Sequence, residues 1–247
     1  MSTLTDRPVV VVGAGLAGLS CAVTLHEAGA PVVVIESDDD VGGRVRTDEV
    51  DGFLLDRGFQ VLLTAYPELD RQLDVKALEL ELFDPGALIH TNERFWELGD
   101  PLQRPASLIP TLRTAVSRSV ATPSDLIRLL ALRFRLSRTD VPDLLRGPDV
   151  ATIDALTTLG FSNRSIQRFF RPLVGGIQLD PSLNTSARMF DTILKMLFTG
   201  RAAVPRHGMR TISQQLGSRL PSSSVHLQVP VRSVTASAVR IDSGEVD

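Results

Sequence analysis

The stretch from Pro8 to Phe59 constrains the fold more than any other part of the sequence. A run of valines ends in Gly-Ala-Gly-Leu-Ala-Gly at residues 13–18, an alanine- and leucine-rich segment follows, and a second valine run ends in Glu36. The order predicts a parallel βαβ unit whose strands, apolar throughout, are buried on both faces. We expect strands at 8–13 and 32–35 with a helix at 16–28 between them.

The glycine segment has the spacing of a dinucleotide-binding loop. Gly13 would permit the tight turn out of the strand, Gly15 would let a pyrophosphate approach the backbone, and Gly18 would let the helix pack against the strands. The N–H groups and the positive dipole end of the helix would face the phosphates. Glu36 could accept hydrogen bonds from both ribose hydroxyls.

A second glycine motif, Val-Gly-Gly-Arg-Val-Arg-Thr, occupies residues 41–47. Adjacent Gly42 and Gly43 give backbone freedom and room for a close neighbour, and Arg44 could place a guanidinium on a phosphate. The alternative is a glycine turn with a surface arginine, which the nearby Glu36 of the fingerprint makes less attractive. The three aspartates at 38–40 predict a solvated turn that would repel an anion.

The chain then returns through Gly-Phe-Leu-Leu-Asp-Arg-Gly-Phe-Gln at residues 52–60. Residues 44–47 and 53–55 are typical of short strands. Asp56 and Arg57 would most simply form a surface ion pair.

In this order, the glycine loop, the acidic residue, the Gly-Gly-Arg motif and Asp-Arg-Gly-Phe-Gln resemble the FAD-binding start of one superfamily. It contains flavoprotein amine oxidases, phytoene desaturases and protoporphyrinogen oxidases. The resemblance implies FAD as the cofactor, where a lone glycine fingerprint would leave NAD equally acceptable. The cofactor-binding residues that it implies are Gly13, Ala14, Gly15, Leu16, Ala17, Gly18, Glu36, Ser37, Gly42, Gly43, Arg44, Gly58, Phe59, Gln60 and the backbone near Val231.

The same resemblance implies an α/β fold with a Rossmann-like FAD-binding domain and an inserted, mixed but mainly helical substrate domain. We expect residues 1–66 and 222–247 in the first domain and residues 67–221 in the second. The matches become weaker beyond residue 60, at Phe-Arg-Pro-Leu-Val-Gly-Gly (170–176) and in a strand at 225–234. Family members continue well past this point, so the resemblance also implies that the C-terminal part of the fold is missing.

A capped amphipathic helix is predicted at residues 122–138. Thr122 can cap it, Pro123 suits its first position, and Asp125 stands at its third. Leucines give the helix an apolar face and arginines give it a basic side. Two interpretations remain: an ordinary helix docked on a core, or a peripheral contact with an anionic membrane surface.

Composition limits the remaining function classes. The chain has 247 residues, 43% of them hydrophobic, and a net charge of −3, which predicts a normal core and no general affinity for nucleic acid. The single Cys21 excludes an internal disulfide, fits a reducing compartment and is expected to be a small packing residue. No signal peptide is evident, so we expect a cytoplasmic protein, with membrane association left open by the helix at 122–138.

The sequence therefore favours a flavin-dependent oxidoreductase that moves a hydride from a C–N or C–H bond of a small, lipophilic organic substrate. A non-catalytic nucleotide-binding module is the alternative, and the Gly-Gly-Arg motif argues against a simple NAD-dependent dehydrogenase. Neither a catalytic residue, a metal ligand nor an oligomeric state is indicated by the sequence.

Overall fold

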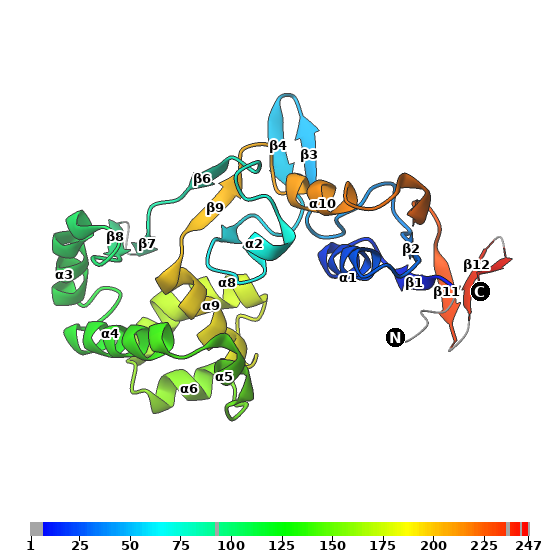
Figure 1. Ribbon diagram of the computed structural model, residues 1–247. Helices are drawn as coiled ribbons and strands as arrows, with labels where there is room; N and C mark the ends of the chain where they lie inside the picture. The colour runs from blue at the N-terminus through cyan, green and yellow to red at the C-terminus, as the bar shows by residue number, and fades with distance from the viewer. Residues whose placement is uncertain (1–6, 92–93, 236–237, 243, 247) are drawn as a thin grey trace. The chain divides into compact units, whose positions relative to one another are not determined.

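The computed structural model describes residues 7–91, 94–235, 238–242 and 244–246, and the chain forms two compact units (Figure 1). Unit 1 comprises residues 1–62, 66–82 and 203–247, and unit 2 comprises residues 63–65 and 83–202. These boundaries differ from the expected ones, because residues 67–82 and 203–221 group with unit 1.

Unit 1 is built on the predicted βαβ unit. Strand β1 (Val9–Val12) pairs in parallel with β2 (Val32–Ile35), and helix α1 (Leu16–Glu27) connects them. A third strand, β10 (Val225–His226), pairs in parallel with the other edge of β2, which gives the order β1-β2-β10. The predicted strands and helix are confirmed.

Helix α10 (Arg210–Gly217) explains the shifted boundary. Its Leu216, together with the following Leu220, packs in one apolar cluster with Leu19 of α1 and Val34 of β2. The segment after residue 203 therefore completes the core of the βαβ unit and is not part of the helical unit.

The expected burial of the first strand is wrong. Val9 is 44% exposed and Val12 is 49% exposed, although both are apolar. Within the described sheet, β1 pairs only with β2, so it is an edge strand, and its valines lack the second neighbour that a central strand would have.

The rest of unit 1 consists of short elements. An antiparallel hairpin follows the second glycine motif, and its first strand begins at Thr47, later than the expected 44–47. The leucines between residues 67 and 82 predict a helix there, but only a single turn forms, at residues 69–72. A three-stranded antiparallel meander lies at the end of the described chain. The Ser-Gly pair at 243–244 predicts a hairpin turn, and the strands on both sides of it pair, although Ser243 lies outside the described residues. The remaining elements of unit 1 are β3 (Thr47–Val50), β4 (Phe53–Asp56), α2 (Leu69–Gln72), β6 (Leu80–Leu82), η3 (Ser222–Ser224), β11 (Val231–Val234), β12 (Val239–Ile241) and β13 (Gly244–Val246). Strands β5 (Leu62–Leu63) and β9 (Ala202–Pro205) each begin in one unit and end in the other.

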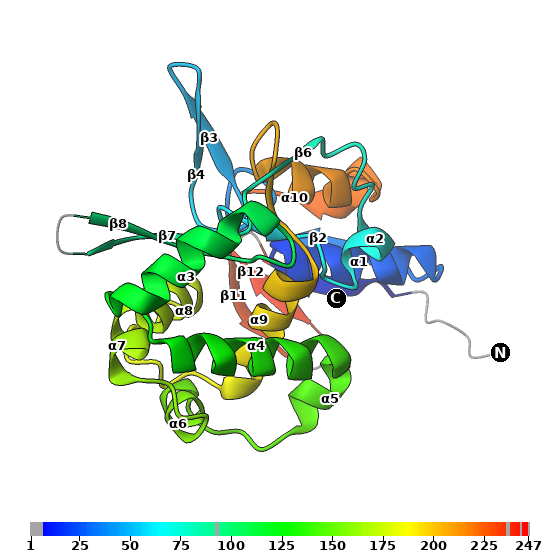
Figure 2. The same ribbon diagram turned by 90° about the vertical axis from the view of Figure 1, so that its left-hand side faces the viewer.

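Unit 2 is a set of helices with one long hairpin (Figure 2). Residues 87–98, whose pattern predicts two short strands around Asn92, form this hairpin, while Asn92 itself lies outside the described residues. The elements are β7 (Gly86–Thr91), β8 (Arg94–Gly99), η1 (Pro105–Ser107), α3 (Leu108–Ser117), α4 (Pro123–Arg138), α5 (Val141–Arg146), α6 (Thr152–Thr158), α7 (Asn163–Ser165), the π-helix η2 (Ile166–Phe170), α8 (Arg171–Gln178) and α9 (Ala187–Thr199).

The core of unit 2 gathers side chains from most of these helices. Phe170, Phe190, Leu136 and Leu156 are each at most 1% exposed and belong to one cluster. Phe170 meets both Phe161 and Phe190 edge-on, with ring centroids 4.7 and 6.0 Å away. The unit therefore has an aromatic core of its own.

Among the described residues, no helix has the length and apolar character needed to cross a membrane. Cys21 differs from the prediction, because it lies on the exposed side of α1 and is not packed.

Candidate dinucleotide-binding site

The glycine loop adopts the geometry that its spacing predicts. Gly13 has a φ of +98°, which favours glycine, and its N–H donates to the carbonyl of Ile35 at 2.7 Å. A Cβ on Gly18 would lie 1.9 Å from the Gly13 carbonyl oxygen. Glycine at position 18 is therefore required for α1 to start this close to the loop.

Gly15 leaves open space at the start of α1. Its φ is −70°, which any residue can adopt, and a Cβ there would meet no heavy atom of the described residues within 4 Å. Gly15 is also the N-cap of α1 and has no side chain to accept from the first-turn N–H groups. This end of the helix is a cradle that fits a phosphate group.

The second glycine motif lies directly against the first. Gly42 donates its N–H to the Ala14 carbonyl at 2.8 Å and forms a parallel bridge with Gly15. Gly42 has a φ of +114°, and a Cβ there would lie 2.6 Å from the Val45 carbonyl oxygen. A Cβ on Gly43 would lie 3.4 Å from the Gly15 Cα, so the two motifs form one glycine-lined surface.

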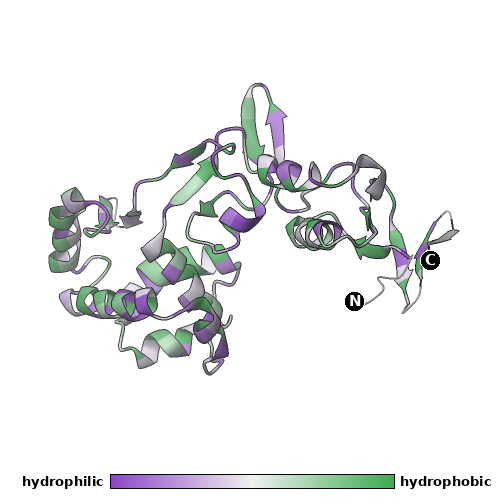
Figure 3. Ribbon diagram, viewed as in Figure 1, coloured by the Kyte–Doolittle hydropathy of each residue, from purple (hydrophilic) through white to green (hydrophobic). Residues whose placement is uncertain are grey.

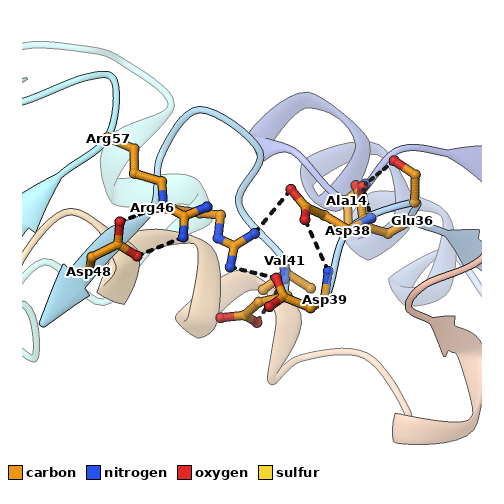
Figure 4. Close-up of polar contacts among 10 residues, drawn as sticks. Ala14, Glu36, Asp38, Asp39, Val41, Arg46, Asp48 and Arg57 are labelled. Carbon is orange, nitrogen blue, oxygen red and sulfur yellow. Dashed lines mark hydrogen bonds and ion pairs between the residues drawn. The ribbon is translucent and has the colours of Figure 1, made fainter.

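Glu36 lies beside this surface and is only 8% exposed (Figure 4). Its carboxylate accepts from the Ala14 N–H at 2.6 Å, the Asp38 N–H at 2.9 Å and the Ser37 hydroxyl at 3.1 Å. Burial raises the pKa of Glu36, but these donors together outweigh it and bring that pKa below its ordinary value. The side chain is thus an ionised acceptor at the edge of the glycine loop.

The segment leading to Val231 follows the same edge. The Val229 N–H donates to the Glu36 carbonyl at 2.8 Å, and the Gln228 N–H donates to the Asp38 carbonyl at 2.9 Å. Val231, two residues later, opens β11 and is half-buried. The structure thus brings the backbone before Val231 next to Glu36 and Ser37.

Arg44 and the segment 58–60 form a second group. The Arg44 guanidinium lies over the Phe59 ring, 5.6 Å from its centroid, and a Cβ on Gly58 would lie 2.4 Å from the Arg44 carbonyl oxygen. Arg44, Gly58, Phe59 and Gln60 are all exposed. Leu16 and Ala17, by contrast, belong to the first turn of α1.

Arg46 is the residue that the sequence analysis missed. Its side chain is 10% exposed and pairs with Asp38 at 3.1 Å and with Asp39 at 2.8 Å (Figure 4). The hydrogen bond from Arg46 lowers the pKa of Asp39. The aspartate turn is therefore exposed, as expected, but its side chains bind an arginine of the second glycine motif. Three acids just before two arginines in the sequence were the signal from which this ion pairing could have been predicted.

The predicted Asp56–Arg57 ion pair is wrong. Arg57 instead forms two hydrogen bonds of 2.7 Å to Asp48 across the hairpin. Asp56 accepts from the Thr47 hydroxyl and from the Met209 N–H. Successive side chains of a strand point to opposite faces, so Asp56 faces the start of α10 while Arg57 faces solvent.

Comparisons with known proteins found similarity over most of the chain. The family model described as flavin containing amine oxidoreductase matches residues 16–247. A coproporphyrinogen III oxidase of Propionibacterium freudenreichii is 31% identical over 175 residues, which cover 68% of this chain and 31% of that protein. A putrescine oxidase of Kocuria rosea is 47% identical over 77 residues, covering 31% of this chain and 16% of that protein.

The fold of the chain is also that of a known oxidase structure. A redesigned triple mutant of putrescine oxidase matches with a TM-score of 0.65 at 23% identity, covering 96% of this chain and 55% of that one. The chain thus spans about half the length of this solved structure and about a third of the coproporphyrinogen oxidase.

Proposed function

Because this chain belongs to the family of flavin-containing amine oxidoreductases, we propose that it acts as an FAD-dependent oxidoreductase on a small organic substrate. FAD, when bound, would accept a hydride from a C–N or C–H bond. The observation that carries the proposal is the single surface made by Gly15 and Gly43 over the open start of α1, with ionised Glu36 beside it.

Each group of site residues has a role in this proposal. Gly13 to Gly18, with Gly42 and Gly43, would hold the pyrophosphate through backbone N–H groups, and Arg44 would contribute charge. Glu36 and Ser37 would bind the adenosine ribose, and the backbone near Val231 would meet the adenine. Gly58 to Gln60 would lie toward the flavin ring.

The division of labour between the units is part of the proposal. Unit 1 contains every proposed cofactor residue, and unit 2 contributes the substrate side. The names of the relatives include oxidases of an amine and of a porphyrinogen, so they support a small organic substrate without choosing between these classes.

The structure favours the docked-helix interpretation of α4 over membrane contact. Leu132 and Leu136 are buried in the unit 2 core, and Arg133 and Arg135 are bound to Asp100 and Asp191. These ion pairs remove two of the arginines from the basic side that an anionic membrane would meet.

Flavin uptake tests the proposal. The chain refolded with FAD and freed of excess cofactor should show flavin absorbance bands, with about one FAD per chain. A colourless chain that is otherwise folded by circular dichroism would overturn the enzyme proposal. Binding of FAD without reduction by any amine, porphyrinogen or carotenoid would instead favour a nucleotide-binding module.

A further inference from the structure

Unit 2 contains a pocket of about 470 Å³ that lies entirely within its own residues. Its walls come from the β7–β8 hairpin with its flanking residues 84–85 and 100–103, from α3, α4, η2, α8 and α9, and from residues 200–202. This volume lies in the range that small-molecule sites occupy, roughly 300–1,000 Å³. The pocket is therefore large enough for a ligand and not only for solvent.

Most of the pocket wall is apolar. Helix α3 contributes Leu112 and helix α4 contributes Leu126 and Leu130, while Phe169 and Leu197 come from η2 and α9. The two helices α3 and α4 both carry apolar segments (Figure 3). Such a surface binds a hydrocarbon body because its burial removes apolar area from water.

One charged pair in the wall is already neutralised. Arg133 and Asp100 form an ion pair with side chains only 14% and 15% exposed, and Arg133 also donates to the Phe198 carbonyl at 3.1 Å. A ligand would have to break this pair to use either charge. The pair therefore shapes the wall without offering a binding charge.

Arg201 differs from Arg133. It lines the pocket and is half-buried, and among the described residues it forms no ion pair. Its Nη2 donates to the Phe83 carbonyl at 2.9 Å, but its buried Nε has no hydrogen-bond partner there. Asp84, the other acid in the wall, is paired with Arg104 and its side chain is 79% exposed.

The buried Nε of Arg201 is closed off from a ligand, but Nη1 has no hydrogen-bond partner among the described residues and is not closed off, so it can donate to an anion. Arginine binds a carboxylate especially well, because two of its N–H groups match the two carboxylate oxygens. We propose that this pocket binds an amphipathic carboxylate, with its apolar body between α3 and α4 and its carboxylate on Arg201. If the ligand is also the oxidised substrate, the inference rests on the proposed function; as a binding site it does not.

Three twelve-carbon probes with different head groups test whether the pocket prefers a negatively charged ligand. Calorimetry at pH 8, below the micelle concentration, would compare dodecanoate, dodecanol and dodecylamine. Dodecanoate should bind at least about tenfold more tightly than dodecanol, which is the effect of one charge-assisted hydrogen bond, and dodecylamine should bind least. Equal binding of the acid and the alcohol, or tightest binding of the amine, would overturn the proposal.

Two arginine variants test whether Arg201 causes the preference for dodecanoate. Arg201→Gln should abolish the preference for dodecanoate while leaving dodecanol binding within about twofold, because only the charge is removed. Arg135→Gln, which removes a charge of α4 that does not line the pocket, should keep the preference. A preference that survives Arg201→Gln would contradict the role of Arg201. Because the ratio between two ligands is measured, a general loss of stability cannot imitate the result.

Two variants on α3 distinguish binding inside the pocket from adsorption to the protein surface. Leu112 lines the pocket and is 49% exposed, whereas Ile109 on the same helix does not line it and is 70% exposed. Leu112→Glu should weaken dodecanoate binding and Ile109→Glu should not. Equal losses of dodecanoate affinity in the two variants would indicate adsorption to the surface and would contradict binding in the pocket. FAD uptake, measured on the same samples, reports separately on the proposed function.

Discussion

Gly15 and Gly18 lie three residues apart in the loop but have opposite surroundings. A Cβ at Gly18 would overlap the Gly13 carbonyl oxygen, while a Cβ at Gly15 would enter open space. Gly18→Ala should therefore destabilise unit 1, whereas Gly15→Ala should fold normally and lose FAD because its methyl group occupies the place proposed for the phosphates. Thermal unfolding and FAD titration of both variants give the two readouts.

A third glycine variant controls for the effect of backbone strain. Gly29→Ala, in another position where a Cβ meets nothing but where φ is +81°, should lose only stability and controls for backbone strain. If Gly15→Ala binds FAD as tightly as the unaltered chain, the phosphates do not lie at the start of α1.

Glu36 should affect only the adenosine half of the cofactor. Glu36→Gln keeps the shape of the side chain but removes the charge that its donors stabilise. Its FAD affinity should fall about tenfold or more, as expected for hydrogen bonds to a charged group, while affinity for FMN, which lacks adenosine, should not change. Glu49→Gln, on the exposed hairpin, is the control. Equal losses for FAD and FMN would show that Glu36 acts through the fold.

Gly18 and Gly42 could be predicted from the sequence because the carbonyl oxygens that exclude a Cβ there, those of Gly13 and Val45, lie only a few residues away along the chain. Arg46 could not be assigned in the same way. Arg44, Arg46 and Arg57 are all close to several acids, and only the folded hairpin decides which arginine turns toward Asp38 and Asp39 and which toward Asp48. Asp56 was missed because its partner Met209 is 153 residues away.

At the scale of elements, Asp125 fixes the start of α4. It is 2% exposed, completes a capping box with Thr122, and also accepts from the N–H and the hydroxyl of Ser162. Asp125→Asn should lower the free energy of unfolding by about 2–3 kcal/mol at pH 7, because a buried, charged acceptor with several donors is lost. Asp143→Asn, at an exposed surface pair, should change it by less than about 0.5 kcal/mol.

The stabilisation from Asp125 should depend on pH in one direction. Burial raises the pKa of Asp125, but its donors from Ser162 and Thr122 prevail and hold it below the ordinary 3.8. A depressed pKa stabilises the folded chain fully above 3.8 and progressively less as pH falls through the lowered value. The difference between the original chain and Asp125→Asn should thus be constant from pH 7 to about pH 5 and shrink below 3.8. A difference that grows in acid would contradict this assignment.

Elements with local end signals were predicted well, and those set by distant partners were not. Helix α4 begins after Thr122, as its N-terminal capping residues predict, and ends at Arg138. The edge position of β1, in contrast, depends on the order of the strands in the sheet, which the four valines of β1 do not indicate. The single turn of α2 likewise falls in a segment without a cap signal of its own.

At the scale of the whole chain, the expected domains and the two compact units divide the sequence at different residues. Residues 67–82 and 203–221 group with unit 1, where Leu73 and Leu216 both pack on the βαβ core. Such long-range packing leaves no local pattern. The resemblance to the flavoprotein superfamily, by contrast, could be recognised from the sequence, because each of its motifs is a short run of residues.

Competition between dinucleotides tests the central claim most directly. Calorimetric titration of the folded chain with FAD, NAD and ADP-ribose should give about one FAD per chain, and FAD should bind at least about tenfold more tightly than NAD, which corresponds to roughly 1.4 kcal/mol. ADP-ribose should compete for the same site, since it contains the groups that Glu36 and the glycine loop would hold. Tighter binding of NAD than of FAD, or no binding of any of the three by the folded chain, would contradict the account.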